Sequence, residues 1–199
     1  MGVGGIGLEA GEEVVEQVDE AHPEPLERPV PLSVPVRVGN DRDGARHRSN
    51  VGGAPRRVGA YVAGMRIAYG TDEQTAATEA LVTHLAAQGH ELVLVADGLD
   101  WPDVGRVVGE AVASARADVG VVWCWTGTGV VMAATKVPGV RAALCGDADT
   151  ARGARRWNDA NVLGLSLRLT TASVAGEIVD AFLATGVDDG EQRLIDRLG

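Results

Sequence analysis

The sequence has little of what stabilises secreted proteins or anchors membrane proteins. It contains only two cysteines, Cys124 and Cys145, so we do not expect a disulfide framework. No apolar run reaches the roughly 18 residues of a transmembrane helix. The N-terminus also lacks the basic and then apolar pattern of a secretory signal. These absences indicate a cytoplasmic protein with reduced thiols.

Positive charge is also scarce. The formal net charge is -10. Electrostatics therefore gives no help to binding nucleic acid or an anionic membrane surface, and neither is an expected partner.

The first third of the chain lacks hydrophobic periodicity. Six of the eight prolines lie before residue 64. Residues 1–64 show neither the period of a strand nor that of a helix, so they bury too little apolar surface to offset the entropy of ordering. We predict a largely disordered extension over 1–64. The alternative is that translation naturally starts at Met65, where the patterned domain of residues 65–199 begins.

From Met65 onward, apolar runs alternate strictly with helix-like segments. The runs that we predict to be strands are 65–70, 91–97, 119–125, 140–145 and 161–166. They are continuously apolar, which is typical of a parallel sheet covered on both faces. We therefore predict a Rossmann-like three-layer α/β/α sandwich with a five-stranded parallel sheet. In such folds, ligands bind at the carboxyl ends of the strands.

Residues 124–129, CWTGTG, connect the third predicted strand to a helix. The glycines let the backbone approach a ligand closely, and a helix N-terminus favours an anion there. A base beside such a loop suits proton abstraction next to a carbonyl, with the loop holding the enediolate oxygen. Cys124 is the candidate base, and simple packing is the alternative. For Cys145, packing is the favoured role.

The order of motifs beyond this loop resembles the ribose-5-phosphate isomerase B and galactose-6-phosphate isomerase family. The stretch that carries the resemblance is CWTGTGVVMAATKVPGVRAALCGDADTARGARRWNDANVLGL, and the likeness extends over 65–199. It implies an aldose–ketose isomerase that acts on a sugar phosphate through a cis-enediolate, without a metal or other cofactor. It also implies a homodimer or dimer of dimers, in which the neighbour's C-terminal region completes each cleft.

The resemblance assigns roles position by position. Cys124 matches the family's proton-abstracting cysteine, and Asp72 matches an aspartate that contacts sugar hydroxyls. Asn158 matches an asparagine that polarises the substrate oxygen, and Arg193 matches an arginine that grips the phosphate. Four residues match the anion-stabilising loop, with Thr126 counted in the catalytic group: Thr126, Gly127, Thr128 and Gly129.

Several positions depart from the family pattern. Glu73 stands where the family commonly has a histidine beside the sugar, and it is a rival base together with Asp72. Trp157 replaces the ring-opening histidine, and Trp125 replaces the first glycine of the loop. An earlier arginine of the phosphate clamp falls near Asp189 or Gly190. Carboxylates near a phosphate dianion repel it.

These departures leave three interpretations open. Other arginines, such as Arg152, Arg155 or Arg168, take over phosphate binding in a working sugar-phosphate isomerase. Alternatively, the substrate is a different or unphosphorylated sugar, on which Trp157 stacks. The third interpretation is a non-catalytic binding or regulatory paralogue.

Overall fold

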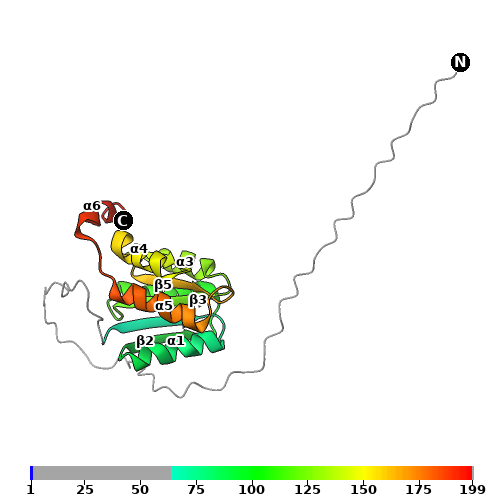
Figure 1. Cartoon of the computed structure of the whole chain (residues 1–199), viewed down its shortest axis with the longest axis horizontal. Helices are drawn as coiled ribbons and strands as arrows, with labels where there is room; N and C mark the ends of the chain where they lie inside the picture. The colour runs from blue at the N-terminus through cyan, green and yellow to red at the C-terminus, as the bar shows by residue number, and fades with distance from the viewer. Residues whose placement is uncertain (2–63, 199) are drawn as a thin grey trace. The chain divides into compact units, whose positions relative to one another are not determined.

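Strands and helices alternate along the residues that the computed structural model describes, which are Met1 and 64–198 (Figure 1). The strands are β1 (Arg66–Thr71), β2 (Glu91–Asp97), β3 (Val119–Cys124), β4 (Ala142–Leu144) and β5 (Val162–Ser166). The α-helices are α1 (Ala76–Ala87), α2 (Trp101–Ala113), α3 (Thr128–Thr135), α4 (Ala148–Asn158), α5 (Ala172–Ala184) and α6 (Gln192–Ile195), and the short 3-10 helix η1 (Asp189–Glu191) precedes α6. The predicted extension over 1–64 lies, apart from its two end residues, outside the described residues.

The five strands form one sheet in the order β2-β1-β3-β5-β4, and every pairing is parallel. The predicted α/β sheet is therefore confirmed. Its fourth strand is shorter than the predicted 140–145. The chain leaves β1 for β2 on one side and returns to β3 on the other, so the strand order reverses between β1 and β3. Ligands of open parallel sheets bind in the crevice at such a reversal.

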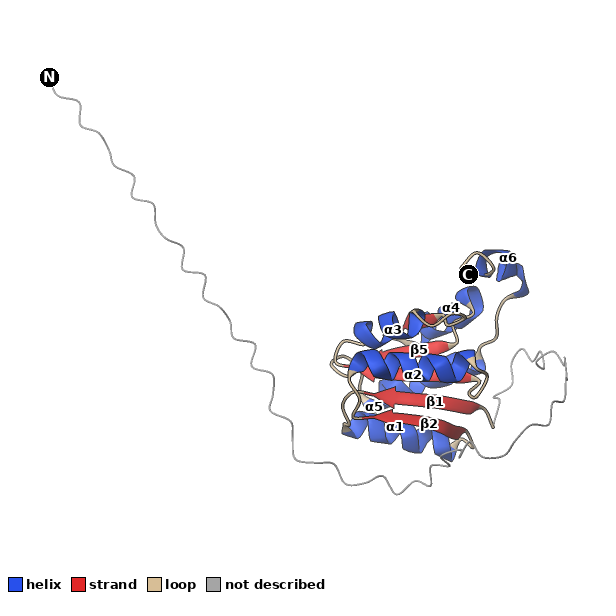
Figure 2. Cartoon of the chain, turned by 180° about the vertical axis from the view of Figure 1, so that it is seen from behind, coloured by secondary structure: helices blue, strands red, loops and turns tan. Residues whose placement is uncertain are grey.

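The two faces of the sheet carry different cores. The opposite views of Figures 1 and 2 show the helices that cover each face, with α5 in front of the sheet in Figure 1 and α2 in front of it in Figure 2. Tyr69 and Trp123 pack with α1, α4 and α5 on one face. Ala68, Val122 and Cys124 pack with α2 and α3 on the other. This division follows from the period of two along each strand. It places Cys124 on the α2 and α3 side.

Glycines allow α2 to approach both the sheet and α3 closely. A Cβ on Gly120 would lie 2.7 Å from Val108 Cγ1, and one on Gly70 would lie 2.8 Å from Val104 Cγ1. In α2 itself, a Cβ on Gly105 would lie 2.7 Å from the Ala133 Cβ and would overlap a backbone carbonyl of α3. The close packing of α2 against α3 therefore requires a glycine at position 105.

Replacing Gly105 with alanine is expected to destabilise the protein. Overpacking of this kind costs about 1–3 kcal/mol in the free energy of unfolding, which outweighs the gain in helix propensity of about 1 kcal/mol. Urea unfolding followed by circular dichroism measures the change. Gly186→Ala is the control, because no heavy atom lies within 4 Å of its added Cβ. Equal stability of the two variants would contradict the packing argument.

Within residues 64–198, no helix combines the length and the apolar character needed to cross a membrane.

Candidate functional site

The ends of β1 and β3 bring Asp72 close to Cys124. Thr71 is in register with Trp123 in the parallel pair, so the next residues, Asp72 and Cys124, follow side by side. Neighbouring strands are about 4.8 Å apart. The alternation of side chains directs Cys124 toward the α2 and α3 face. A carboxyl group and a thiol thus follow neighbouring strand ends at the point where the strand order reverses.

The loop after Cys124 forms the start of α3. Gly127 is the N-cap and adopts a left-handed conformation with φ 76. A Cβ at this position would lie 2.8 Å from the Leu165 carbonyl oxygen, so glycine is required. No side chain caps the helix. The first backbone N–H groups of α3 therefore remain available to an anion.

The two threonines of this loop are hydrogen-bonded to each other. The Thr126 and Thr128 hydroxyl oxygens are 2.7 Å apart and share a hydrogen bond. Both side chains are exposed at the mouth of the loop. The predicted loop residues 126–129 are thus assembled around one helix terminus, next to Cys124.

The loop that follows β5 fixes the backbone of Cys124. Leu167 N–H donates to the Cys124 carbonyl at 3.1 Å, and Arg168 N–H donates to the Trp125 carbonyl at 3.0 Å. The Ser166 hydroxyl donates to the same Trp125 carbonyl at 2.9 Å. These bonds hold the backbone of Cys124 and Trp125 in place. They also bring Arg168 to the same edge of the sheet.

Asp72 has an unusual environment for a carboxylate. It is half-buried, and its Oδ1 has no hydrogen-bond partner among the described residues. Burial raises the pKa of Asp72; nearby backbone N–H groups partly offset this shift, and the neighbouring Glu73 charge reinforces it. A carboxyl group with a raised pKa in a cleft is a candidate for proton transfer. Glu73 itself is exposed.

Trp101 belongs to this site, although the sequence analysis gave it no role. It is the first residue of α2 and is 47% exposed. A Cβ on Gly129 would lie 2.9 Å from the indole ring, so the ring rests on the backbone of the anion loop. The available signal was an aromatic residue before proline, four residues after a strand end, because such a residue starts a helix at the ligand edge.

The structure places the remaining predicted residues, Trp157, Asn158 and Arg193, elsewhere. Asn158 ends α4, which runs back from the carboxyl edge of the sheet to the start of β5. The neighbouring Asp159 pairs with Arg141 at 2.6 Å, just before β4 begins. The length of β5, roughly 16 Å, therefore separates Asn158 from the edge that carries Cys124.

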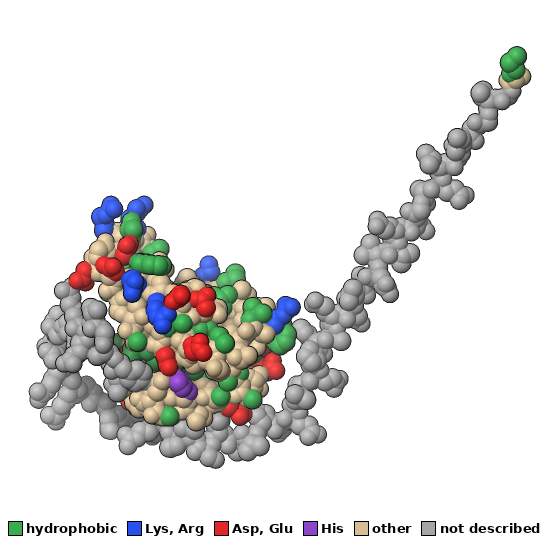
Figure 3. All heavy atoms as spheres, viewed as in Figure 1, with side chains coloured by type: hydrophobic (Ala, Val, Ile, Leu, Met, Phe, Trp, Pro, Cys, Tyr) green, Lys and Arg blue, Asp and Glu red, His purple; other side chains and the backbone are tan. Residues whose placement is uncertain are grey.

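The C-terminal segment lies at the same edge of the sheet as Asn158. Asp188 N–H donates to the Arg156 carbonyl at 2.8 Å, which ties the segment to the end of α4. Figure 2 shows α6 at the end of the sheet opposite the arrowhead of β1. Basic side chains gather over the part that carries α6 (Figure 3), where Arg193 and Arg197 are exposed. Within one copy, the predicted site is thus divided between two opposite edges.

The three arginines considered as replacements for the phosphate clamp differ in their contacts. Arg155 pairs with Asp159 at 3.1 Å and lies 5.4 Å from the centroid of the Phe182 ring. Burial lowers the pKa of Arg155, against the opposing effect of Asp159. Its role is structural. Arg152 pairs with Asp149 at 2.6 Å. Arg168 is exposed beside the loop of Cys124, and its guanidinium has no partner among the described residues.

Cys145 is buried and protected. Its thiol lies 3.7 Å from the Ala143 carbonyl oxygen. Burial, with a contribution from the Asp147 charge, raises the pKa of Cys145 to about 11. This environment suits packing rather than chemistry.

A thiol-alkylating reagent is therefore expected to modify Cys124 before Cys145. At about pH 8, only about one in a thousand Cys145 thiols is ionised, and the thiolate is the reactive form. Iodoacetamide labelling followed by peptide mass spectrometry measures both rates. The Cys124→Ser variant should lose the faster reaction. Faster labelling of Cys145 in the folded protein would contradict the assignment.

Among residues 64–198, no group of three histidine, cysteine or acidic side chains is placed to hold a metal ion.

Comparison with known proteins adds independent evidence. A family model described as ribose/galactose isomerase matches residues 67–198. Ribose-5-phosphate isomerase B of Escherichia coli is 33% identical over 117 residues, which cover 57% of this chain and 78% of that protein. Galactose-6-phosphate isomerase subunit LacB of Clostridium acetobutylicum is 43% identical over 83 residues, 42% of this chain and 48% of that subunit. The chain thus spans about half the length of that relative.

A solved structure agrees with the sequence matches. The structure of ribose-5-phosphate isomerase B from Clostridium thermocellum matches with a TM-score of 0.63 and 35% identity. The match covers 68% of this chain and 95% of that one. The similarity therefore extends over nearly the whole of that solved structure.

Proposed function

Since the chain belongs to the ribose/galactose isomerase family, as its motifs predicted, we propose that it is an aldose–ketose isomerase that acts on a sugar phosphate. The observation that carries this proposal is that Cys124 and Asp72 stand at neighbouring strand ends beside the uncapped start of α3. It unites a candidate base, a carboxyl group with a raised pKa and an anion site in one crevice.

The reaction proceeds by proton transfer through a cis-enediolate. The thiolate of Cys124 takes the proton from C2 of the aldose, and the electron pair moves onto the carbonyl oxygen at C1. The N–H groups of the loop over 126–129 stabilise this oxyanion. The proton then returns to C1, the C2 hydroxyl loses its proton, and the C1 oxygen gains one, which gives the ketose. Asp72 hydrogen-bonds to the sugar hydroxyls and exchanges protons with them.

We also propose that two copies share each cleft. Asn158 and Arg193 lie at the opposite edge from Cys124, so one copy does not bring them to the same sugar. A second copy supplies them, with Asn158 polarising the substrate oxygen and Arg193 binding the phosphate. The short α6 spans only four residues and needs tertiary contacts to be stable. Docking against a partner cleft provides such contacts.

Arg168 is the second cation in this proposal. Its free guanidinium stands at the edge of Cys124, and it binds the phosphate opposite Arg193 of the other copy. The Glu73 carboxylate instead favours a substrate with less negative charge near the end of β1. The two substrate classes are thus a sugar phosphate, which we favour, and an unphosphorylated sugar.

The deciding experiment uses pentose and hexose phosphates and their unphosphorylated forms in deuterium oxide. Isomerisation through an enediolate exchanges the proton at C1 or C2 for deuterium, and NMR detects the exchange even when little product accumulates. Exchange with at least one phosphorylated sugar is expected. Exchange only with free sugars would reassign the substrate, and no exchange with any sugar would favour a non-catalytic paralogue.

A further inference from the structure

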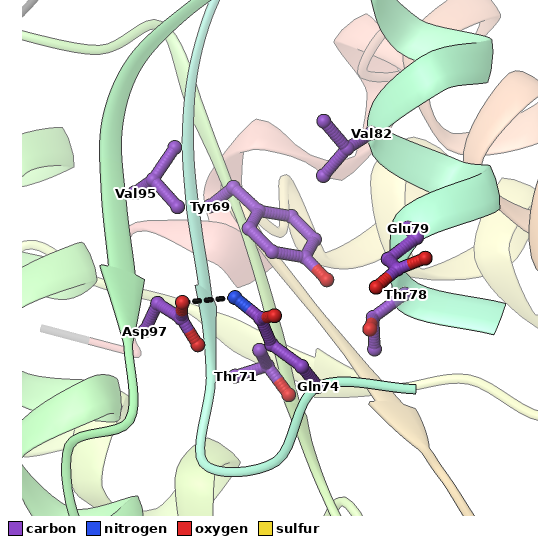
Figure 4. A pocket seen from close by; sticks show the side chains of 8 residues that line it. All are labelled: Tyr69, Thr71, Gln74, Thr78, Glu79, Val82, Val95 and Asp97. Atoms are coloured by element: carbon purple, nitrogen blue, oxygen red, sulfur yellow. Dashed lines mark hydrogen bonds between the residues drawn. The ribbon is translucent and has the colours of Figure 1, made fainter. Parts of the chain in front are cut away.

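The proposed sugar cleft depends on how a second copy presents its edge of the sheet. Within one copy, the cavity between β1, β2 and α1 measures about 10 Å³ (Figure 4). This volume is of the order required by one water molecule, so the cavity does not hold a sugar. In the proposed function, Asn158 and Arg193 instead reach the Cys124 edge of another copy. The placement of these two residues relative to each other therefore matters for the reaction.

Asp159 directly follows Asn158 and turns the chain at the end of α4. It is the C-cap of the helix and adopts a left-handed conformation with φ 45, which few residue types other than glycine tolerate. Its N–H donates to the Arg155 carbonyl at 3.2 Å. The N–H of Ala160 donates to the Ala154 carbonyl at 2.9 Å. The backbone that carries Asn158 is thus fixed by the residues that follow it.

Two arginines from different parts of the chain hold the Asp159 carboxylate. Arg141 donates to Oδ2 at 2.6 Å, and its Nε donates to the Asp159 carbonyl at 2.9 Å. Arg155 donates to Oδ1 at 3.1 Å. The Asp159 side chain is 33% exposed, and those of Arg141 and Arg155 are 25% and 18% exposed. Solvent therefore screens these ion pairs less than it screens pairs on the open surface.

Arg155 extends this network to the C-terminal segment. Its Nε donates to the carbonyl of Thr185, the C-cap of α5, at 3.3 Å. A few residues further along, Asp188 N–H donates to the Arg156 carbonyl at 2.8 Å. The chain then continues into η1 and α6, which carries Arg193 (Figure 2). The same helix end thus fixes the start of both segments that the partner's cleft receives.

We propose that Asp159 is a positioning residue for the reaction in the neighbouring copy's cleft. Through Arg141 and Arg155, it aligns Asn158 with the segment that carries Arg193, so that both enter the cleft as one unit. Asn158 must bring its amide within hydrogen-bond distance of the reacting oxygen, and a misplacement of about 1 Å can lower the rate about 100-fold. This inference rests on the proposed function and on its shared cleft.

A helix cap with no positioning role would tolerate a change that this proposal forbids. A left-handed cap needs only a residue that accepts a positive φ, and glycine does so without steric cost. Asp159→Gly therefore keeps the turn and removes the carboxylate. The two guanidinium groups then lose the negative charge that they share. The glycine variant thus tests the side chain of Asp159 and not the turn.

The first test compares Asp159→Gly with the wild-type full chain, using the sugar phosphate that exchanges deuterium fastest in the wild type. We expect kcat/KM to fall by about 10–100-fold while circular dichroism shows a folded protein. Asp118→Asn is the matched control, because Asp118 pairs with Arg66 at 2.6 Å at the same edge of the sheet. This control should lose stability and keep its activity. Equal activity of Asp159→Gly and the wild type would overturn the proposal.

Subunit mixing shows which half of the cleft the change affects. Asp159→Gly mixed with Cys124→Ser should reach about a quarter of wild-type activity, because half of the dimers are mixed and half of their clefts are intact. Asp159→Gly mixed with Asn158→Ala should not recover, because each mixed dimer has a defect in both clefts. A misfolded chain would recover with neither partner.

The mixture of Cys124→Ser with Asn158→Ala is the reference for this test. If the reference recovers and Asp159→Gly with Cys124→Ser does not, Asp159 is not a positioning residue of that half of the cleft. Recovery of Asp159→Gly with Asn158→Ala would also overturn the proposal. If the reference itself fails, the shared cleft is wrong.

A readout without substrate separates failure of this inference from failure of the proposed function. Amide hydrogen exchange followed by mass spectrometry reports the hydrogen-bonded N–H groups of Ala160, Asn161 and Asp188. Their protection should fall in Asp159→Gly and stay unchanged in Asp118→Asn. Unchanged protection at all three in Asp159→Gly would overturn the inference, whatever the activity. A wild type that exchanges deuterium into no sugar would overturn the proposed function instead.

Discussion

Replacing Cys124 with serine is expected to lower turnover of the true substrate by about 10²–10⁴-fold, the usual range for removal of an acid–base group. Cys124 is 5% exposed and ends a buried strand, and serine nearly preserves its volume. The backbone bonds from Leu167 and Arg168 do not involve the thiol. Stability should therefore change little while the far less acidic hydroxyl fails as a base. Steady-state kinetics and urea unfolding measure the two effects.

Controls separate chemistry from packing. Cys145→Ser should chiefly reduce stability, because that thiol is buried and its pKa is raised. Cys124→Ala should resemble Cys124→Ser in turnover. If Cys124→Ser retains more than about a tenth of the wild-type rate, the thiol is a packing residue. A carboxylate, Asp72 or Glu73, would then be the base.

Two inactive variants are expected to recover activity when their subunits are mixed. In a shared-cleft dimer, a Cys124→Ser copy and an Asn158→Ala copy form one cleft with both changes and one cleft with neither. Random pairing makes half of the dimers mixed, and half of their clefts are intact. The mixture should thus reach about a quarter of wild-type activity. Co-refolding of equal amounts from urea, followed by an activity assay, measures the recovery.

The matched control pairs changes on the same edge of the sheet. Cys124→Ser mixed with Asp72→Asn should show no recovery, because each mixed dimer then carries one defect in each cleft. Recovery with this pair, or none with Asn158→Ala, would contradict the shared cleft. A fully active monomer by light scattering would contradict it as well.

The sheet could be predicted because the hydrophobic pattern of short sequence segments was enough to identify its strands and helices. The apolar runs that became β1, β3 and β5 are continuous, and the sequence between them has the period of a helix. The fourth strand is shorter than its apolar run because it is an edge strand that pairs only with β5. The predicted disorder of residues 1–64 stays a prediction.

The site was only partly predictable. Matching motifs identified the residues but gave no positions in space. The position of Asn158 could have been predicted from the direction of α4, because a helix that follows a parallel strand runs back to the opposite edge of the sheet. That rule separates Asn158 from Cys124 without any coordinates. By contrast, the contact of Trp101 with Gly129 and the burial of Arg155 depend on tertiary packing, which the sequence pattern did not reveal.

The glycines packed against α2 and α3 also determine which sequence changes the lineage can accept. A Cβ on Gly164 would overlap the Val131 side chain, so an alanine there is tolerable if Val131 shrinks at the same time. The two positions can covary. Gly105 instead abuts the backbone carbonyl of Val130, and a carbonyl cannot be mutated away. Among homologues, position 105 should therefore be nearly invariant, whereas positions 164 and 131 should exchange volume as a pair.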